Sequence, residues 1–177
     1  MRACTASNAP VSLEEVLASR EARATRQKRA LGIGFGAVVS FTVNMPGAIK
    51  DTPEARAIFL AGLDALQCIA ERKRIGLEFL SELYPATGPE ALLCLALTPL
   101  EAKELTTMVE SAHALGRLFD MDVLDMEGVP VSRRTLGLPP RTCLVCESEA
   151  VLCARSRRHS LDEVLAVIQK MVAAYDP

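Results

Sequence analysis

The chain has 177 residues, half of them hydrophobic, and its 20 Lys and Arg residues nearly balance 22 Asp and Glu residues. This length and composition predict one globular domain with a substantial core. The net charge of −2 gives no general attraction to nucleic acid or anionic membranes, and the 4% of aromatic residues without Trp argues against a stacking platform for single strands.

Hydropathy along the chain indicates where the protein works. No apolar run approaches the ~20 residues that a membrane span requires, and the N-terminus lacks the hydrophobic segment of a signal peptide. We therefore expect a cytoplasmic protein without membrane or nucleic-acid partners, in which thiols stay reduced. Clustered cysteines then indicate metal binding or chemistry more often than disulfides.

The first predicted element is a helix in an N-terminal extension over residues 1–31. Ser12 and Glu15 form a capping box, and an apolar stripe starts at Leu13. The helix is predicted to continue to about Arg29, and its later turns are strongly basic. We interpret these cations as a solvated face that favours the C-terminal end of the helix. Contact with an acidic partner is the alternative.

A glycine-rich run, Gly32-Ile-Gly-Phe-Gly36, follows that helix. A dinucleotide-binding fingerprint requires a strand before its glycines and a helix after them. Here the glycines precede the strand-like residues 37–42, so we interpret the run as a loop. Lys50 lies in the turn-rich connection after that strand, where it is a candidate phosphate contact. A solvated loop lysine is the alternative.

Residues 37–132 predict an α+β core. Helices begin after the N-caps Thr52 and Thr98, and strand-like runs occupy residues 37–42, 77–84, 91–97 and 118–124. The resulting order is β-α-β-β-α-β, which predicts a ferredoxin-like split β-α-β sandwich. A nucleotidyltransferase-like sheet is the alternative topology. The rest of the single domain, residues 133–177, is a Cys-rich and Arg-rich segment with a last helix.

Asp120 and Asp122 lie in the last of these strands, among Leu, Phe, Met and Val. Side chains alternate along a strand, so both carboxylates project from the same face. Asp is unfavourable in strands, and carboxylate oxygens are the ligands that hard cations such as Mg²⁺ prefer. We therefore predict a magnesium site here. Two ordinary Asp residues on a solvent-facing edge strand are the alternative.

The C-terminal segment contains Cys143, Cys146, Cys153 and His159 in the spacing C-x2-C-x6-C-x5-H. Three thiolates and an imidazole suit tetrahedral zinc, and C-x2-C is the usual knuckle spacing. A redox C-x-x-C is disfavoured because no thioredoxin-like β-α-β unit surrounds it. Two alternatives stay open, namely a chance cluster of cysteines and a His159 that only precedes the last helix.

Charge is concentrated in the same segment. Between Ser132 and Ser160 there are six arginines and two glutamates, a local net charge of +4. Upstream, Glu110 and His113 make one E-x-x-H pair on a predicted helix. Di-iron bundles need two such pairs and two further Glu-bearing helices, so this class of site is excluded.

Several motifs together carry a resemblance to a known family. The longest, from His113 to Val123, reads His-x-Leu-Gly-Arg-Leu-Phe-Asp-x-Asp-Val. The others are Val39-Ser-Phe-Thr-Val43, Pro46-Gly-x-Ile-Lys50, Gly88-Pro-Glu90, Ser132-Arg-Arg, Leu138-Pro-Pro-Arg-x-Cys-Leu-x-Cys146 and Cys153-Ala-Arg155. Over nearly the whole chain the sequence resembles the holo-citrate lyase synthase family, also called apo-citrate lyase phosphoribosyl-dephospho-CoA transferase. Thr87, where Ser is expected, is one departure.

The resemblance implies transfer of 2′-(5″-triphosphoribosyl)-3′-dephospho-CoA to a serine of the citrate lyase acyl-carrier (gamma) subunit, with release of pyrophosphate. Under it, Asp120 and Asp122 would hold magnesium against the substrate phosphates. His113 is a candidate base for the serine proton, with a helix-end cap as the alternative. The candidate substrate-binding cations are Arg117, Arg133, Arg134 and Lys50. The basic stretch between residues 141 and 158 would dock the carrier or hold the CoA part.

Two other functions stay open. One is a zinc-stabilised module that binds the carrier subunit or the precursor without chemistry. That module would be indifferent to replacement of Asp120 or Asp122 by Asn, whereas the enzyme would lose transfer. The other is the same reaction on a different carrier, such as that of malonate decarboxylase, which a comparison of both carriers would separate.

Overall fold

A computed structural model describes residues 5–33 and 36–176 of the chain. Gly34 and Phe35 of the predicted glycine loop, with residues 1–4 and 177, lie outside the described residues. The described elements are α1 (Leu13–Leu31), β1 (Ala37–Val43), α2 (Pro53–Lys73), β2 (Leu77–Leu83), β3 (Glu90–Leu95), α3 (Pro99–Ala112), the 3₁₀ turn η1 (Gly116–Leu118), β4 (Phe119–Leu124), the 3₁₀ turn η2 (Arg133–Leu136), α4 (Ala150–Ser156) and α5 (Leu161–Ala173).

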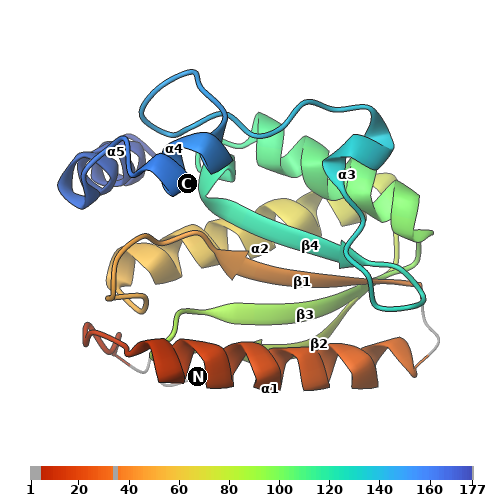
Figure 1. Cartoon of the computed structure of the whole chain (residues 1–177). Helices are drawn as coiled ribbons and strands as arrows, with labels where there is room; N and C mark the ends of the chain where they lie inside the picture. Colours follow the sequence, from red (N-terminus) through yellow and green to blue (C-terminus); the bar gives the residue numbers. More distant parts are fainter. Residues whose placement is uncertain (1–4, 34–35, 177) are drawn as a thin grey trace.

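The four strands form one sheet in the order β2-β3-β1-β4 (Figure 1). The central strand β1 pairs with β3 on one side and with β4 on the other, and every neighbouring pair is antiparallel. β1 and β2 therefore run in the same direction with β3 between them. The predicted mixture of helices with a β-sheet is confirmed at this level.

Local sequence signals explain most element boundaries. The capping boxes that begin α1, α3 and α5 are formed, each around a Ser or Thr cap that stabilises its helix by about 1 kcal/mol. α1 extends to Leu31, two residues past its predicted end, and Leu118 belongs to η1 instead of the strand. The sequence did not predict α4, because its N-cap Glu149 makes no side-chain capping bond.

The main core lies between one face of the sheet and the helices α2 and α3. Phe41 of β1 stacks on Phe59 of α2 at 5.1 Å between ring centroids and meets Phe119 of β4 edge to face. All three rings are fully buried. Gly62 of α2 allows this close approach, because a Cβ there would lie 2.4 Å from the Phe41 ring. The aromatic contacts therefore fix α2 against the start of β4.

α1 lies across the opposite face of the sheet (Figure 1). Its Ala30 packs in a smaller apolar cluster with Val38, Leu92, Cys94 and Leu124. These strand residues alternate with the main-core residues, as the two-residue period requires. The sheet is thus covered by α2 and α3 on one side and by α1 on the other.

The C-terminal helices α4 and α5 stand together at one end of the molecule, beside the start of β4 (Figure 1). Ile168 of α5 is buried in the main core, and α5 contacts α2. The chain between η2 and α4 has no long helix or strand of its own. Among the described helices, none is long and apolar enough to cross a membrane.

Candidate functional site

Asp120 and Asp122, called the Asp pair below, project from β4 into the layer that contains α1. Phe119 and Met121 alternate with them and are buried in the main core on the opposite face. In the sheet register Asp120 lies opposite Thr42 of β1, and the Thr42 hydroxyl lies 3.5 Å from an Asp120 carboxylate oxygen. The structure therefore places both carboxylates on one accessible face.

The surroundings of Asp122 raise the pKa of its carboxyl group. Although the side chain reaches solvent, desolvation by the protein around it is the main cause, and the negative charge of Asp120 is the second. Lys103 partly opposes this shift. A divalent cation would relieve the repulsion because it neutralises both carboxylates. The pair thus has the donor chemistry of a hard-cation site.

A second acidic group faces the α1 layer on the other side of β1. Glu90, at the start of β3, lies opposite Thr42 in the register and is buried. It forms ion pairs with Arg23 of α1, at 3.0 Å, and with Arg26. α1 is therefore tied over β3. On the same face, Asp122 of β4 is exposed.

Lys50 lies in the loop between β1 and α2, at the same end of the sheet. Its ammonium group donates a hydrogen bond to the carbonyl of Met45. Burial is the main cause that lowers the pKa of Lys50, and repulsion from Arg20 adds to it. The predicted phosphate contact is therefore half-buried and engaged with the backbone.

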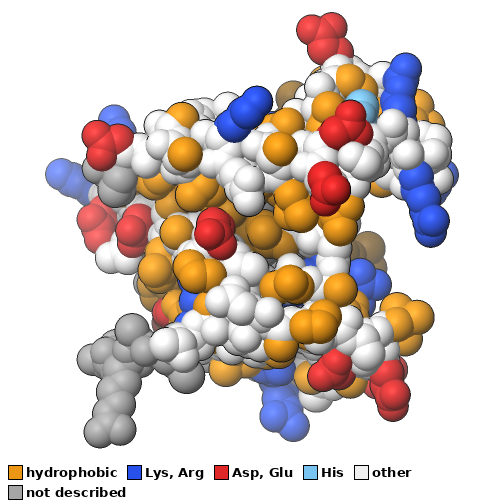
Figure 2. Space-filling view, turned by 90° about the vertical axis from the view of Figure 1, so that its left-hand side faces the viewer, with side chains coloured by type: hydrophobic (Ala, Val, Ile, Leu, Met, Phe, Trp, Pro, Cys, Tyr) orange, Lys and Arg blue, Asp and Glu red, His pale blue; other side chains and the backbone are white. Residues whose placement is uncertain are grey.

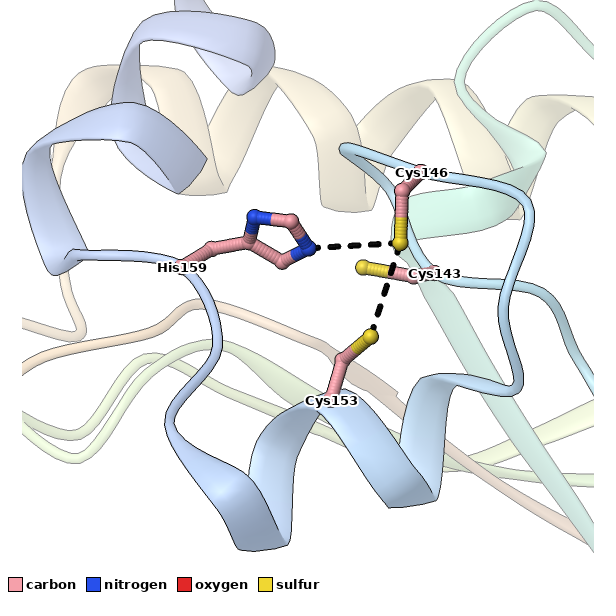
Figure 3. Close-up of side chains that lie close together, drawn as sticks. All are labelled: Cys143, Cys146, Cys153 and His159. Atoms are coloured by element: carbon pink, nitrogen blue, oxygen red, sulfur yellow. Dashed lines mark hydrogen bonds between the residues drawn. The ribbon is translucent and has the colours of Figure 1, made fainter.

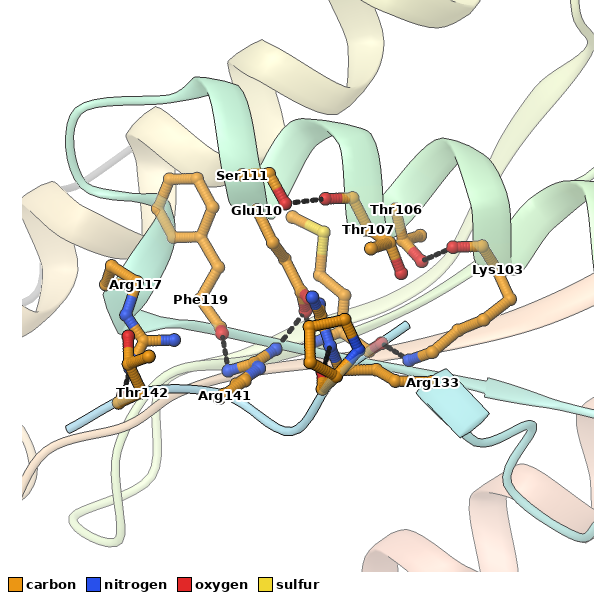
Figure 4. Close-up of polar contacts among 12 residues, drawn as sticks. Lys103, Thr106, Thr107, Glu110, Ser111, Arg117, Phe119, Arg133, Arg141 and Thr142 are labelled. Carbon is orange, nitrogen blue, oxygen red and sulfur yellow. Dashed lines mark hydrogen bonds and ion pairs between the residues drawn. The ribbon is translucent and has the colours of Figure 1, made fainter. Parts of the chain in front are cut away.

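Charged side chains close the outer edge of β4 (Figure 4). Glu110 of α3 accepts the Met121 N–H at 3.1 Å, and Lys103 donates to the Met121 carbonyl at 3.0 Å. Arg141 donates to the Phe119 carbonyl at 2.9 Å and forms an ion pair with Glu110. An edge strand otherwise exposes such backbone groups. These contacts hold in place the strand that carries the Asp pair.

The arginines predicted to bind phosphate fall into two groups. Arg133 lies 3.6 Å from Glu110, and Arg117 donates to a backbone carbonyl in the Cys-rich segment. Desolvation, followed by repulsion from Arg141 and Arg133, lowers the pKa of Arg117. Arg134 is exposed. The structure thus brings Arg117 and Arg133 to the β4 edge and leaves Arg134 in solvent.

His113 lies on the core side of the sheet. Its ring is 4.9 Å from the Phe119 ring and 5.2 Å from the Tyr175 ring, measured between centroids. The Nδ1 atom accepts a hydrogen bond from the Leu115 N–H at 3.0 Å, and burial lowers the pKa of the imidazole. The structure therefore does not bring His113 to the face that carries the Asp pair.

Cys143, Cys146, Cys153 and His159, called the Cys/His cluster below, converge in space (Figure 3). Their ligand atoms all lie within 4.8 Å of one another, with Cys146 Sγ 3.5 Å from Cys153 Sγ and 3.3 Å from His159 Nε2. Sulfur ligands of a tetrahedral zinc stand ~3.8 Å apart, since each Zn–S bond is ~2.3 Å. The cluster can hold a metal ion such as zinc.

Hydrogen bonding prepares one thiol of this cluster for ligation. Bonds from the Ser148 backbone and from the His159 side chain lower the pKa of Cys146 to about 6. Desolvation raises the pKa of Cys153. A thiolate is the form that binds metal. Spacing in the sequence was sufficient to predict that these four residues gather.

A cavity of about 820 Å³ lies between the loop after β1, the turn η1 and the C-terminal segment. We call it the arginine pocket. It is lined by Asn44, Pro46, Gly47, Arg117, Arg141, Cys143, Leu144, Ala150, Cys153, Ala154, Arg157, His159, Ser160, Leu161 and Val164. Neither member of the Asp pair lines it. Three residues of the Cys/His cluster form part of its wall.

Sequence reasoning missed Glu110 and Lys103 as buried charges. They lie seven residues apart and therefore on one face of α3, among apolar neighbours. Charged residues on an otherwise buried helical face are a signal that could have found them. It also missed the pairing of Glu90 with Arg23 and Arg26, which needs the packing of α1 on the sheet.

Comparison with known proteins gives a family match over most of the chain. The profile of the family described as apo-citrate lyase phosphoribosyl-dephospho-CoA transferase matches residues 11–175. Proteins of that name from Escherichia coli and from Shigella boydii serotype 18 are each 40% identical to this chain over 171 residues. These alignments cover 97% of this chain and 93% of each relative. The Asp pair, the β4 edge and the Cys/His cluster all lie within the matched residues.

Proposed function

The chain belongs to the apo-citrate lyase phosphoribosyl-dephospho-CoA transferase family, and we propose that it attaches the phosphoribosyl-dephospho-CoA prosthetic group to apo-citrate lyase. The observation that carries this proposal is the match to proteins of that name over residues 11–175. We propose further that the precursor is 2′-(5″-triphosphoribosyl)-3′-dephospho-CoA. The acceptor would be a serine of the acyl-carrier subunit.

In this reaction the serine oxygen forms a bond to the phosphorus atom next to the ribose. The bond from that phosphorus to the pyrophosphate group breaks, and pyrophosphate leaves with the electron pair. The serine proton passes to a base or to solvent. Such a transfer needs positioning and charge neutralisation more than covalent help from the protein.

The Asp pair supports this chemistry best. Asp120 and Asp122 would hold Mg²⁺, which supplies charge neutralisation at the phosphates and the leaving group. Their common face fits a cation site, as does the raised pKa of Asp122, which desolvation causes first and the charge of Asp120 second. Thr42 contacts the Asp120 carboxylate, and Glu110 fixes the backbone of Met121 between the two carboxylates.

The remaining roles at the site stay predictions. Arg117 and Arg133 are proposed phosphate contacts, because both stand at the β4 edge, where Glu110 lies near Arg133 and repulsion between arginines acts on Arg117. Lys50 would have to leave the Met45 carbonyl to reach a phosphate, and Arg134 would approach from solvent. A base role for His113 would use Nε2, because Nδ1 already accepts a backbone hydrogen bond.

We propose a structural Zn²⁺ at the Cys/His cluster. The donor set of three sulfurs and one imidazole nitrogen suits a closed tetrahedral site. The segment that contains it has only the seven-residue helix α4 as regular structure, so it gains most from a cross-link. The ion would join the chain before α4 to the chain before α5.

For the core we propose the ferredoxin-like class. Its support is the order β-α-β-β-α-β together with the sheet order β2-β3-β1-β4, in which β3 separates the parallel strands β1 and β2. α2 and α3 both cover the face opposite α1. This arrangement supports the split β-α-β assignment that we propose.

Intact mass spectrometry of the carrier subunit tests the function. The carrier is incubated with this protein, magnesium and the triphosphoribosyl precursor. We expect a mass gain equal to the precursor minus pyrophosphate, and no gain with Asp120→Asn, which should stay folded by circular dichroism. Asp64→Asn is a matched control, because Asp64 is an exposed Asp on α2.

Precursor and carrier are first confirmed active with a known synthase. No mass gain on the citrate lyase carrier would then overturn the proposal. A gain only on the carrier of malonate decarboxylase would assign a different acceptor. Binding of the carrier without transfer, unaffected by Asp120→Asn, would identify a non-catalytic module.

A further inference from the structure

The arginine pocket carries an excess of positive charge. Arg117, Arg141 and Arg157 line it, and among the described lining residues there is no Asp or Glu. Glu110 pairs with Arg141 from outside the pocket and also lies near Arg133, so one carboxylate serves two guanidinium groups. The guanidinium of Arg117 donates a hydrogen bond to the neutral carbonyl of Thr142. An anionic ligand would complete this arrangement.

Apart from the arginines, most of the exposed pocket wall is apolar, although Asn44, His159 and Ser160 also line it. Leu144 comes from the Cys-rich segment, Leu161 and Val164 come from α5, and Pro46 comes from the loop after β1. Figure 2 shows hydrophobic side chains gathered across the middle of this end of the molecule, with Lys and Arg side chains at its right-hand margin. The ligand that fits therefore has both an apolar chain and phosphate groups.

The size and shape of the pocket favour a small molecule over a protein surface. Its volume of about 820 Å³ lies within the range of about 300 to 1,000 Å³ that small-molecule sites occupy. Protein docking faces are flatter and spread over a larger area. The basic C-terminal segment thus encloses a cavity at this point instead of presenting an even convex face.

The pocket also adjoins the strand that carries the Asp pair. Asn44 lines the pocket one residue after β1 ends, and its N–H donates to the Leu118 carbonyl at 2.9 Å. Arg141 lines the pocket and donates to the carbonyl of Phe119, the residue before Asp120. A ligand in the pocket therefore lies beside the beginning of β4.

We propose that the arginine pocket binds the dephospho-CoA part of the precursor, an assignment that rests on the proposed function. The arginines neutralise the phosphates of the nucleotide, and the apolar wall receives the pantetheine chain. The triphosphate at the other end of the precursor extends toward the Asp pair. The positive charge of the C-terminal segment thus serves the small substrate and not the carrier protein.

Calorimetric titration of the whole chain with dephospho-CoA tests this assignment. We expect saturable binding that Arg117→Gln and Arg157→Gln each weaken about tenfold or more, since each removes a charge-assisted contact. Arg155→Gln is the matched control, because Arg155 is exposed on α4 and does not line the pocket. That variant should change the affinity by about twofold at most, as solvated surface charges do.

A second variant tests the pocket by volume. Ala154 lines the pocket from α4 and is exposed, so Ala154→Phe fills the cavity without overpacking the core. We expect it to abolish dephospho-CoA binding while circular dichroism stays unchanged. Unchanged affinity in Arg117→Gln, Arg157→Gln and Ala154→Phe would overturn the assignment. Tighter binding of pyrophosphate than of dephospho-CoA would also overturn the assignment, because the pocket would then bind the triphosphate end of the precursor, from which pyrophosphate leaves.

Comparison with the carrier assay separates this inference from the function. Asp120→Asn should bind dephospho-CoA as the unaltered chain does and yet fail to transfer the group. If every pocket variant binds dephospho-CoA with wild-type affinity and still transfers the group, the pocket assignment alone is overturned. Pocket-dependent binding without transfer to any carrier supports the pocket and sinks the function.

Discussion

Glu110 and Arg141 form an ion pair against the outer edge of β4, and each also bonds to the backbone of that strand. The Glu110 side chain is almost completely buried, whereas Arg141 keeps part of its surface in solvent. Edge strands in other sheets are often blunted by charges that point into solvent. Here the charges pair with each other and bond to the backbone of Phe119 and Met121, while residues 129–131 pair with the end of β4.

Replacement of Glu110 by Gln should destabilise the protein. The variant leaves Arg141 and Arg133 without their shared carboxylate but keeps an acceptor for the Met121 N–H. We expect the free energy of unfolding to fall by about 2 to 3 kcal/mol, somewhat less than for a fully buried pair, because both arginines stay partly solvated. Urea denaturation measures the change. Glu104→Gln, on the exposed side of the same helix, is the control, and equal midpoints for the two variants would contradict the assigned role.

The charged carboxylate of Asp122 should lower the free energy of unfolding of the protein. Its pKa is raised in the fold, so the folded state binds the proton more tightly than the unfolded state. The cost appears as the pH rises above the ordinary value of 3.8 and is complete above the raised pKa. At pH 7 without magnesium, Asp122→Asn should therefore increase the free energy of unfolding, by less than about 1 kcal/mol because the side chain is exposed.

At pH 3, below the ordinary pKa of 3.8, the Asp122 carboxyl group is mostly protonated and therefore neutral, like the Asn side chain of the variant. The difference in free energy of unfolding between the two proteins should then nearly vanish. Thermal unfolding across this pH range checks the prediction, and the same variant should lose transfer. Asp64→Asn serves as the control for removal of one carboxylate. A stability loss at pH 7 would show that the negative charge of Asp122 is compensated in the fold.

Cys143→Ser should remove the metal from the C-terminal segment. We expect about one equivalent of zinc in the purified chain, and a large loss of it in this variant because a structural site needs all four ligands. Dephospho-CoA affinity should fall as well, since Cys143 also lines the arginine pocket. Elemental analysis and calorimetry measure the two effects. Cys68→Ser, an exposed cysteine of α2, should change neither, and a wild-type chain purified without metal would oppose the site.

His113→Phe separates catalysis from packing. The ring packs against Phe119 and Tyr175, away from the face of the Asp pair, so we expect the variant to stay folded and to keep transfer within about tenfold. A general base would contribute about 100-fold or more. The rate of carrier modification, followed by mass, decides between the two. A loss of that size, with an unchanged unfolding midpoint, would assign His113 as the base.

Periodicity and spacing predicted the parts of this molecule that depend on local sequence. Alternation along β4 predicted that Asp120 and Asp122 share one face. The C-x2-C-x6-C-x5-H pattern predicted the Cys/His cluster. The capping residues Ser12, Thr52 and Thr98 predicted the starts of three helices. Capping and alternation operate over a few residues. The Cys/His pattern is specific in residue type, so it can be recognised without knowing how the chain between its members folds.

The rest depends on contacts between distant segments. Arg26 meets Glu90 across 64 positions of sequence, and Arg141 reaches the β4 edge from beyond η2. The position of His113 relative to the Asp pair was also hidden, because it depends on the packing of α3 against the core face of the sheet, whereas the Asp pair projects from the other face. The arginine pocket needs three segments to meet, so no single stretch of sequence encodes it.

Because side chains alternate along β4, the register of this strand against β1 decides on which face the Asp pair lies. A slip of one residue against β1 would turn both carboxylates of the Asp pair into the aromatic core and expose Phe119 and Met121. Burial of two unpaired charges costs several kcal/mol each, so such a molecule would not persist. The two residues that we propose to hold Mg²⁺ would thereby also select the correct register of the strand that carries them.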